Sequence, residues 1–228
     1  MTLYQYPPQT ALKRVIPKPR IYDGAAASTA LRERFVREVD QIVWAHKLAP
    51  ETLNLPATKA VPEIQVFRIT LKGDSLHDDI LRAIDRAIPF PVMFELLAGE
   101  RIQAAAAFKR PSEAGAGKWV VSEHMRGAWV GRETPRSPLP VAVTLGALYE
   151  GMLSPLMPVA PEVGEDVETR LARAAQIKAK EREIAQLQSK LKRENQFNIK
   201  VTLHGQLAEA RSEFEHMKTP SRGDKGTP

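Results

Sequence analysis

The sequence has no cysteine, few aromatic residues and no long uninterrupted apolar run. Without cysteine the chain has no disulfides, no thiolate zinc sites and no cysteine nucleophiles, and it fits a reducing compartment. Aromatic residues make up 6% of the 228 residues, so we expect a mainly aliphatic core. Residues 1–19 contain four prolines and no apolar run, which argues against a secretory signal.

The longest weakly charged stretch, residues 139–160, is unsuited to crossing a membrane. Its length would suffice for a span. However, three prolines interrupt a helix there, and Glu150 would place a charge near the bilayer centre. We therefore predict a short buried helix at residues 143–153 followed by a proline-rich linker, and a cytoplasmic protein with no membrane span.

Apolar residues at 43% and charged residues at 26% indicate a folded protein. The net charge is +6 and the pI about 9.6, and the basic excess lies in residues 1–60 and 161–228. Clusters of this kind contact phosphates non-specifically, although many simply form the solvated face of a helix. The candidate nucleic-acid contacts are Lys13, Arg14, Lys18, Arg20, Lys109, Arg110, Lys190, Lys192 and Arg193.

The N-terminal region predicts an arm followed by a helix. Residues 1–24 are rich in proline and end in Asp-Gly, so we expect an extended arm. Residues 25–47 predict a helix, because Leu31, Phe35 and Ile42 recur with Val39 at three- and four-residue steps.

Residues 25–160 are expected to form an α+β core domain, with the N-terminal helix beside a β-α-β-β-β unit. This order follows from an alternating apolar pattern, the N-cap residue Ser75 and a hairpin signal at residues 98–100. The expected elements are a strand at 63–71, a helix from Ser75 to Ile88, hairpin strands at 92–97 and 101–108, and short strands at 118–122 and 128–130.

Residues 161–218 have the pattern of amphipathic helices. The apolar spacing slips around residues 194–198, so either an antiparallel helical hairpin or coiled coil turns there, or one long helix shifts its face. We favour the hairpin, because Asn195 and Asn198 suit a turn and a cap. Residues 219–228 are expected to be a disordered tail. The second helix carries an apolar stripe, formed by Leu203, Leu207, Ala210, Phe214 and Met217. This stripe needs a surface to pack against, which is the other helix of the hairpin, a second copy of the chain or another protein.

Three residues have side chains suited to a magnesium-dependent nuclease, in which acids hold the metal beside a lysine. They are Asp74, Glu95 and Lys109. The usual Glu-x-Lys spacing on one strand is missing. Glu95 and Lys109 lie on the two arms of the expected hairpin, where they would instead pair with each other.

Two further motifs favour structural roles. Residues 73–76 spell a serine-esterase signature, but no histidine stands where that family places its base. Residues 77–79, His-Asp-Asp, lack the spacing of metal ligands, and the acids suit the first turn of a helix. We expect no metal site and no cofactor.

Several segments in the same order resemble an uncharacterised family of prokaryotic proteins, catalogued as a domain of unknown function, from about residue 4 to residue 217. Members look like companions of a helicase and a DNA methyltransferase in restriction-like phage-defence gene clusters, and the family has no assigned catalytic residues to carry over. The segments are Ile16-Pro-Lys18; Trp44-Ala-His-Lys-Leu48 with Thr52 and Asn54; Glu63-Ile-Gln-Val-Phe67; Val92-Met-Phe-Glu95 with Ala107-Phe-Lys-Arg110; and residues 190–198 with Val201.

The first hypothesis is a non-catalytic accessory subunit that acts as an adaptor for a helicase or methyltransferase, with its basic ends near DNA. The alternative is a magnesium-dependent nuclease or another DNA-processing enzyme of the same system. A stand-alone DNA binder is a third option, and a homo-oligomer through the C-terminal helices is compatible with the first. The residues themselves favour an interaction protein over an enzyme.

Overall fold

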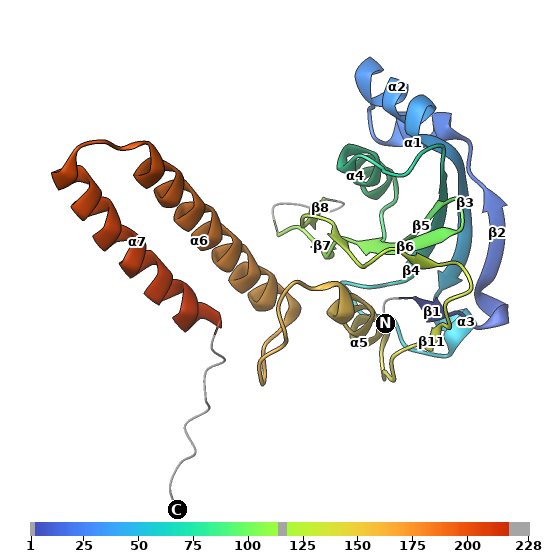
Figure 1. Ribbon diagram of the computed structural model, residues 1–228. Helices are drawn as coiled ribbons and strands as arrows, with labels where there is room; N and C mark the ends of the chain where they lie inside the picture. The colour runs from blue at the N-terminus through green and yellow to red at the C-terminus, as the bar shows by residue number, and fades with distance from the viewer. Residues whose placement is uncertain (1–2, 114–117, 219–228) are drawn as a thin grey trace, which may run out of the picture. The chain divides into compact units, whose positions relative to one another are not determined.

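The computed structural model describes residues 3–113 and 118–218, and the tail expected at 219–228 lies outside them. The chain divides into two compact units, Met1–Met157 and Pro158–Pro228. The first unit is an α+β domain and the second a pair of helices (Figure 1). The α+β class and the C-terminal helical pair are therefore confirmed. Within the described residues, no helix is long and apolar enough to cross a bilayer.

A mixed sheet organises the first unit. In the described part of the chain it has seven strands in the order β10-β6-β5-β4-β3-β2, with β9 also paired to β6. Among the described strands of this sheet, only β4 and β5 pair in parallel, and helix α4 connects them. The bounds are β2 Ala11–Val15, β3 Val39–Leu48, β4 Ile64–Leu71, α4 Asp78–Ala87, β5 Val92–Ala98, β6 Arg101–Ala106, β9 Met125–Arg126 and β10 Val130–Gly131.

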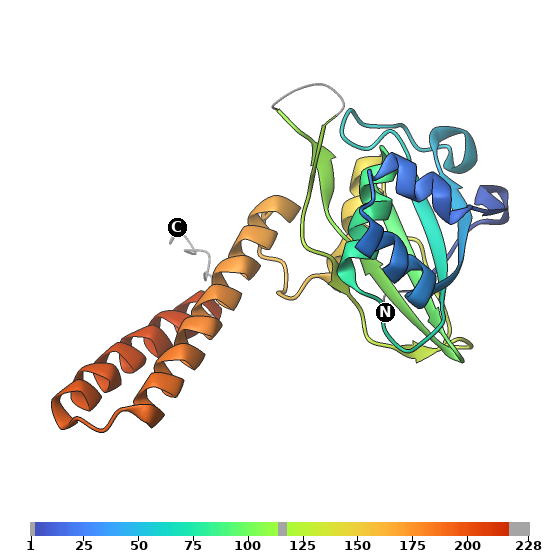
Figure 2. The ribbon, with the colours of Figure 1, turned by 90° about the horizontal axis from the view of Figure 1, so that it is seen from above.

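Helices α1 (Lys18–Gly24), α2 (Thr29–Glu38) and α4 lie next to one another over one face of the sheet (Figures 1 and 2). Their apolar side chains join those of the strands in one core cluster. A β-carbon on Gly24 would lie 2.9 Å from Cβ of Ala87, so glycine lets the end of α1 approach α4 closely. Members of this cluster include Ile21, Phe35, Phe67, Ile80, Ile84 and Phe94.

The N-terminal region differs from the expectation. Within residues 1–24, β2 forms the edge strand of the sheet beside β3, and α1 packs on α4. The helix expected at 25–47 was wrong beyond Glu38, because residues 39–48 form β3. Bulges in the β3–β4 pairing leave Val39, Ile42, Ala45 and Leu48 buried, so burial recurs every third residue as in a helix.

The remaining expectations for the core were close. The strand at 63–71, the 92–108 hairpin and the buried helix α5 (Leu145–Leu153) are confirmed. Helix α4 begins later than expected, because His77 and not Ser75 is its N-cap. Short pairs add β1 (Tyr4–Gln5) with β11 (Ser137–Pro138), and β7 (Lys109–Pro111) with β8 (Trp119–Val121). Other short elements are η1 (Pro8–Thr10), α3 (Pro50–Leu53) and η2 (Ser154–Leu156).

The second unit is a helical hairpin of α6 (Val167–Arg193) and α7 (Phe197–Lys218). The two helices are antiparallel (Figure 1), which excludes the single long helix. The side chain of Asp166 caps α6 by accepting a hydrogen bond from the Thr169 amide at 2.7 Å. The helices pack through small and apolar side chains, among which Ala174 of α6 and Leu207 and Ala210 of α7 are buried.

Candidate functional site

Asp74 lies on the loop after β4, and its carboxylate is exposed. Its Oδ1 accepts a hydrogen bond from Arg101 Nη2 at 2.7 Å. This pair links the loop to the start of β6. An exposed ion pair of this kind contributes little to stability.

Glu95 lies in the middle of β5, and only 2% of the residue is exposed. Arg68, its register partner on β4, donates to Oε2 at 2.8 Å, and Arg136 donates to Oε1 at 2.5 Å. Burial by itself would raise the pKa of the Glu95 carboxyl. The two arginines outweigh burial, so its pKa lies below the ordinary value.

Aromatic and imidazole groups surround this ion cluster. The ring of Tyr6 stacks on His46, with centroids 4.5 Å apart. Burial first, and then the charge of Glu95, raise the pKa of Tyr6 well above its ordinary value. Burial lowers the pKa of His46, whose Nδ1 lies 2.9 Å from the Thr10 hydroxyl. These groups are neutral near pH 7, so Glu95 and its two arginines dominate the local charge.

Lys109 lies on β7 and is 1% exposed. Its Nζ donates to the carbonyl oxygens of Asp85 and Ile88 at 2.5 Å each, at the C-terminal end of α4. The carboxylate of Asp85 is 3.8 Å away and also accepts a hydrogen bond from His124 at 2.7 Å. Burial lowers the pKa of Lys109 to about 8, and Asp85 opposes that shift. Lys109 thus acts as a buried cap for the helix end.

The three catalytic candidates therefore have three separate sets of partners. Glu95 lies opposite Ala104 on β6, and it does not pair with Lys109 as expected across the hairpin. Among the described residues, no group of three or more metal-binding side chains comes together. The chemistry that the structure supports for these residues is the stabilisation of the fold.

The basic candidates are spread over several elements. Lys13 and Arg14 are exposed on β2, whereas Lys18 donates to the Val39 carbonyl at 2.5 Å. Lys109 is buried, so it cannot contact a phosphate of a nucleic acid. Arg110 lies on β7, Arg20 lies on α1 beside a pocket, and Lys190, Lys192 and Arg193 form the last turn of α6.

The predicted partner stripe lies inside the hairpin. Leu207 and Ala210 are buried, and the other three residues are half-buried along the same face of α7. They pack against α6, so the hairpin itself occupies much of this stripe. The half-buried members are Leu203, Phe214 and Met217.

The opposite face of α7 presents a second stripe that the sequence reasoning missed. Phe197 is 79% exposed and Val201 is 56% exposed. Gly205, Ala208 and Ser212 continue the same face at steps of four, three and four residues, and all three are exposed. We call these five residues the α7 outer face. The four-residue step from Phe197 to Val201 was the available signal.

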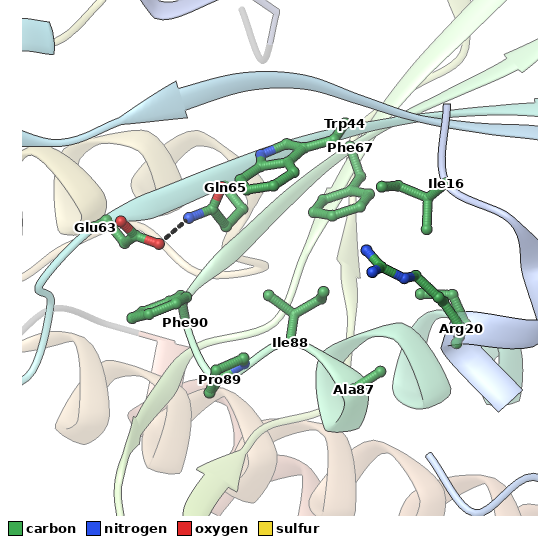
Figure 3. A pocket seen from close by; sticks show the side chains of 11 residues that line it. Ile16, Arg20, Trp44, Glu63, Gln65, Phe67, Ala87, Ile88, Pro89 and Phe90 are labelled. Atoms are coloured by element: carbon green, nitrogen blue, oxygen red, sulfur yellow. Dashed lines mark hydrogen bonds between the residues drawn. The ribbon is translucent and has the colours of Figure 1, made fainter. Parts of the chain in front are cut away.

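A pocket of about 360 Å³ opens beside the core of the first unit (Figure 3). The rings of Trp44 on β3 and Phe67 on β4 form one wall; they are parallel within 3°, with centroids 6.1 Å apart. Residues 88–90, which connect α4 to β5, form the other wall. Glu63 and Gln65 lie at one end and Arg20 at the other.

The sequence reasoning also missed this pocket as a site. It placed Trp44 on a helix, so Trp44 and Phe67 did not come together. The signal was present in Glu63-Ile-Gln-Val-Phe67, where alternation puts three residues on one side of a strand and one of them is a buried glutamine.

The chain resembles a family of known sequences. Residues 5–214 match the sequence model of a family described as a domain of unknown function, DUF4391. No curated protein matches the chain, and no solved structure matches it.

Proposed function

The chain belongs to the DUF4391 family, and we propose that it is a non-catalytic accessory subunit that binds a partner protein through the α7 outer face. The observation that carries this proposal is the exposure of Phe197 and Val201 on a helix whose opposite face is already buried. Large apolar side chains that are contiguous and exposed mark interaction surfaces.

The shape of the α7 outer face suits another helix. Phe197 and Val201 stand one turn apart and provide the anchors that a groove or helix would cover. Beyond them, a β-carbon added at Gly205 would meet nothing within 4 Å, so a partner backbone can come close there. Ala208 extends the flat surface by a further turn.

The charges around the α7 outer face indicate what kind of surface the partner has. Lys190, Lys192 and Arg193 at the end of α6 and Lys200 near the start of α7 lie at the same end of the hairpin as Phe197. Glu194 is the acidic residue at this turn. The partner surface should therefore be acidic around an apolar centre, because opposite charges steer the two proteins together.

The identity of the partner rests on the sequence resemblance. It implies a helicase and a DNA methyltransferase of a restriction-like phage-defence system, and we propose that the chain is their adaptor or scaffold. The nuclease alternative has less support, because Asp74, Glu95 and Lys109 are each engaged with different partners.

Co-purification tests the proposal. The tagged full-length chain is expressed with a helicase and a DNA methyltransferase of the kind that the resemblance implies, as wild type and with Phe197→Asp or Val201→Asp. Aspartate at position 197 stands at the start of α7, where it favours the helix. We expect both variants to lose the partner.

The matched control is Ala172→Asp, which adds the same charge at an exposed position of α6. It should retain the partner. If both α7 variants also retain it, the proposed surface is wrong.

A further inference from the structure

The pocket between Trp44 and residues 88–90 is a slot for a flat molecule. Two parallel, stacked aromatic rings on neighbouring strands line one side, and Ile88 and Phe90 line the other (Figure 3). A volume of about 360 Å³ falls within the range of small-molecule sites. Aromatic walls favour a planar ring, because offset stacking adds to the burial of apolar surface.

The same slot contains an unpaired donor and an unpaired acceptor. Gln65 is 1% exposed, and its Nε2 donates to Glu63 Oε1 at 2.6 Å. Its Oε1 and the indole Nε1 of Trp44 are both buried and without a hydrogen-bond partner. Unsatisfied buried groups are uncommon and call for a missing partner. Both atoms are shielded from solvent, and Gln65 Oε1 becomes available to a ligand in the slot if the amide rotates.

The charges of the slot favour an anion at one end. Glu63 is already paired with Lys47 at 3.0 Å and with Gln65. Arg20 projects from α1 toward the slot (Figure 3), and no described side chain or carbonyl pairs with its guanidinium. A guanidinium is suited to phosphate or carboxylate oxygens, which it binds in a forked geometry.

We propose that this slot binds a planar heteroaromatic ring that bears an anionic group, with the ring between Trp44 and Phe90 and the anion on Arg20. An exocyclic amine or ring N–H at the edge of the ligand ring would donate to Gln65 Oε1. A nucleotide and a heteroaromatic carboxylic acid share this chemistry.

Calorimetric titration of the full-length chain tests the proposal with four probes. They are adenosine monophosphate, indole-3-acetate, adenosine and ribose phosphate. We expect one of the first two to bind, and which one binds identifies the source of the ligand. Adenosine should bind about tenfold more weakly than its monophosphate where the nucleotide is the ligand, because the charged hydrogen bonds are lost. Ribose phosphate, which has no ring to stack, should not bind.

Two variants assign the site. Arg20→Ala should weaken the anionic ligand about tenfold and leave the affinity for adenosine unchanged, whereas Arg14→Ala, exposed on β2, should change neither. Trp44→Phe replaces the indole with a smaller ring and reduces the stacking area, so it should weaken the binding of every ring. The proposal is wrong if neither anionic ring binds at millimolar concentration, or if Arg20→Ala affects adenosine as much as its monophosphate.

Discussion

Replacing Lys109 with methionine tests whether this lysine is a structural element of the core. The substitution keeps the length of the side chain and removes its amine. Two carbonyl oxygens at the end of α4 would lose a donor, and Asp85 would keep only His124 as a partner. Removing one partner of a buried ion pair lowers the free energy of unfolding by about 3–5 kcal/mol.

The pH dependence gives the same variant a second signature. Lys109 has a pKa of about 8 in the folded protein, below its ordinary value of 10.5. Between these values the unfolded chain binds more protons than the folded chain, so the stability contributed by this group rises with pH. The full rise would be about 3 kcal/mol. The window to examine is pH 8 to 10, because the buried Tyr6 and Tyr149 have raised pKa values and oppose the rise at higher pH.

Urea denaturation of the wild type, Lys109→Met and Lys118→Met at pH 7, 8, 9 and 10 measures both effects. Lys118 is exposed, so its substitution should change stability by less than about 0.5 kcal/mol. Lys109→Met should unfold at a lower urea concentration and lose the upward slope. A loss no greater than that of Lys118→Met, with the slope retained, would refute the buried-cap role.

Two further predictions concern the ion cluster and the hairpin. Glu95→Gln should lower the free energy of unfolding by about 3–5 kcal/mol, because Arg68 and Arg136 lose their buried carboxylate; Asp74→Asn, at an exposed pair, should stay within about 0.5 kcal/mol in the same urea assay. Because the folded pKa of Glu95 is lowered, its contribution is complete above pH 4.5 and fades as the pH falls through that lowered value. Leu207→Ala should destabilise the hairpin by about 2–3 kcal/mol. The rate of amide hydrogen exchange should then rise in α6 and α7, while the amides of β4 and β5 stay protected. Equal loss of protection in the sheet would contradict two independent units.

The local patterns predicted much of the fold. The strand at 63–71, the 92–108 hairpin and the C-terminal helical pair follow from apolar spacing and turn residues that agree with their surroundings. Residues 39–48 were misassigned because bulges set the burial of Val39, Ile42, Ala45 and Leu48 at every third residue. A bulge depends on how two strands pair, so the sequence of a single strand does not reveal it.

The site was harder to predict for a related reason. Lys109 and Glu95 are both buried charges, and their partners come from distant segments: Asp85 for the lysine, and Arg68 and Arg136 for the acid. Their residue types suggested catalysis, whereas only the tertiary pairing reveals their structural role. The Trp44 pocket depends likewise on β3 and β4 being neighbours.

The most direct test of the account is the affinity of the purified chain for the partner that co-purifies with it. Biolayer interferometry would compare the wild type with Val201→Asp and Ala172→Asp. The account predicts a Kd at least about tenfold higher for Val201→Asp, since an apolar anchor that the partner would cover is replaced by a charge, and no change for Ala172→Asp. Equal affinities for the wild type and Val201→Asp would contradict the claim that the α7 outer face holds the partner.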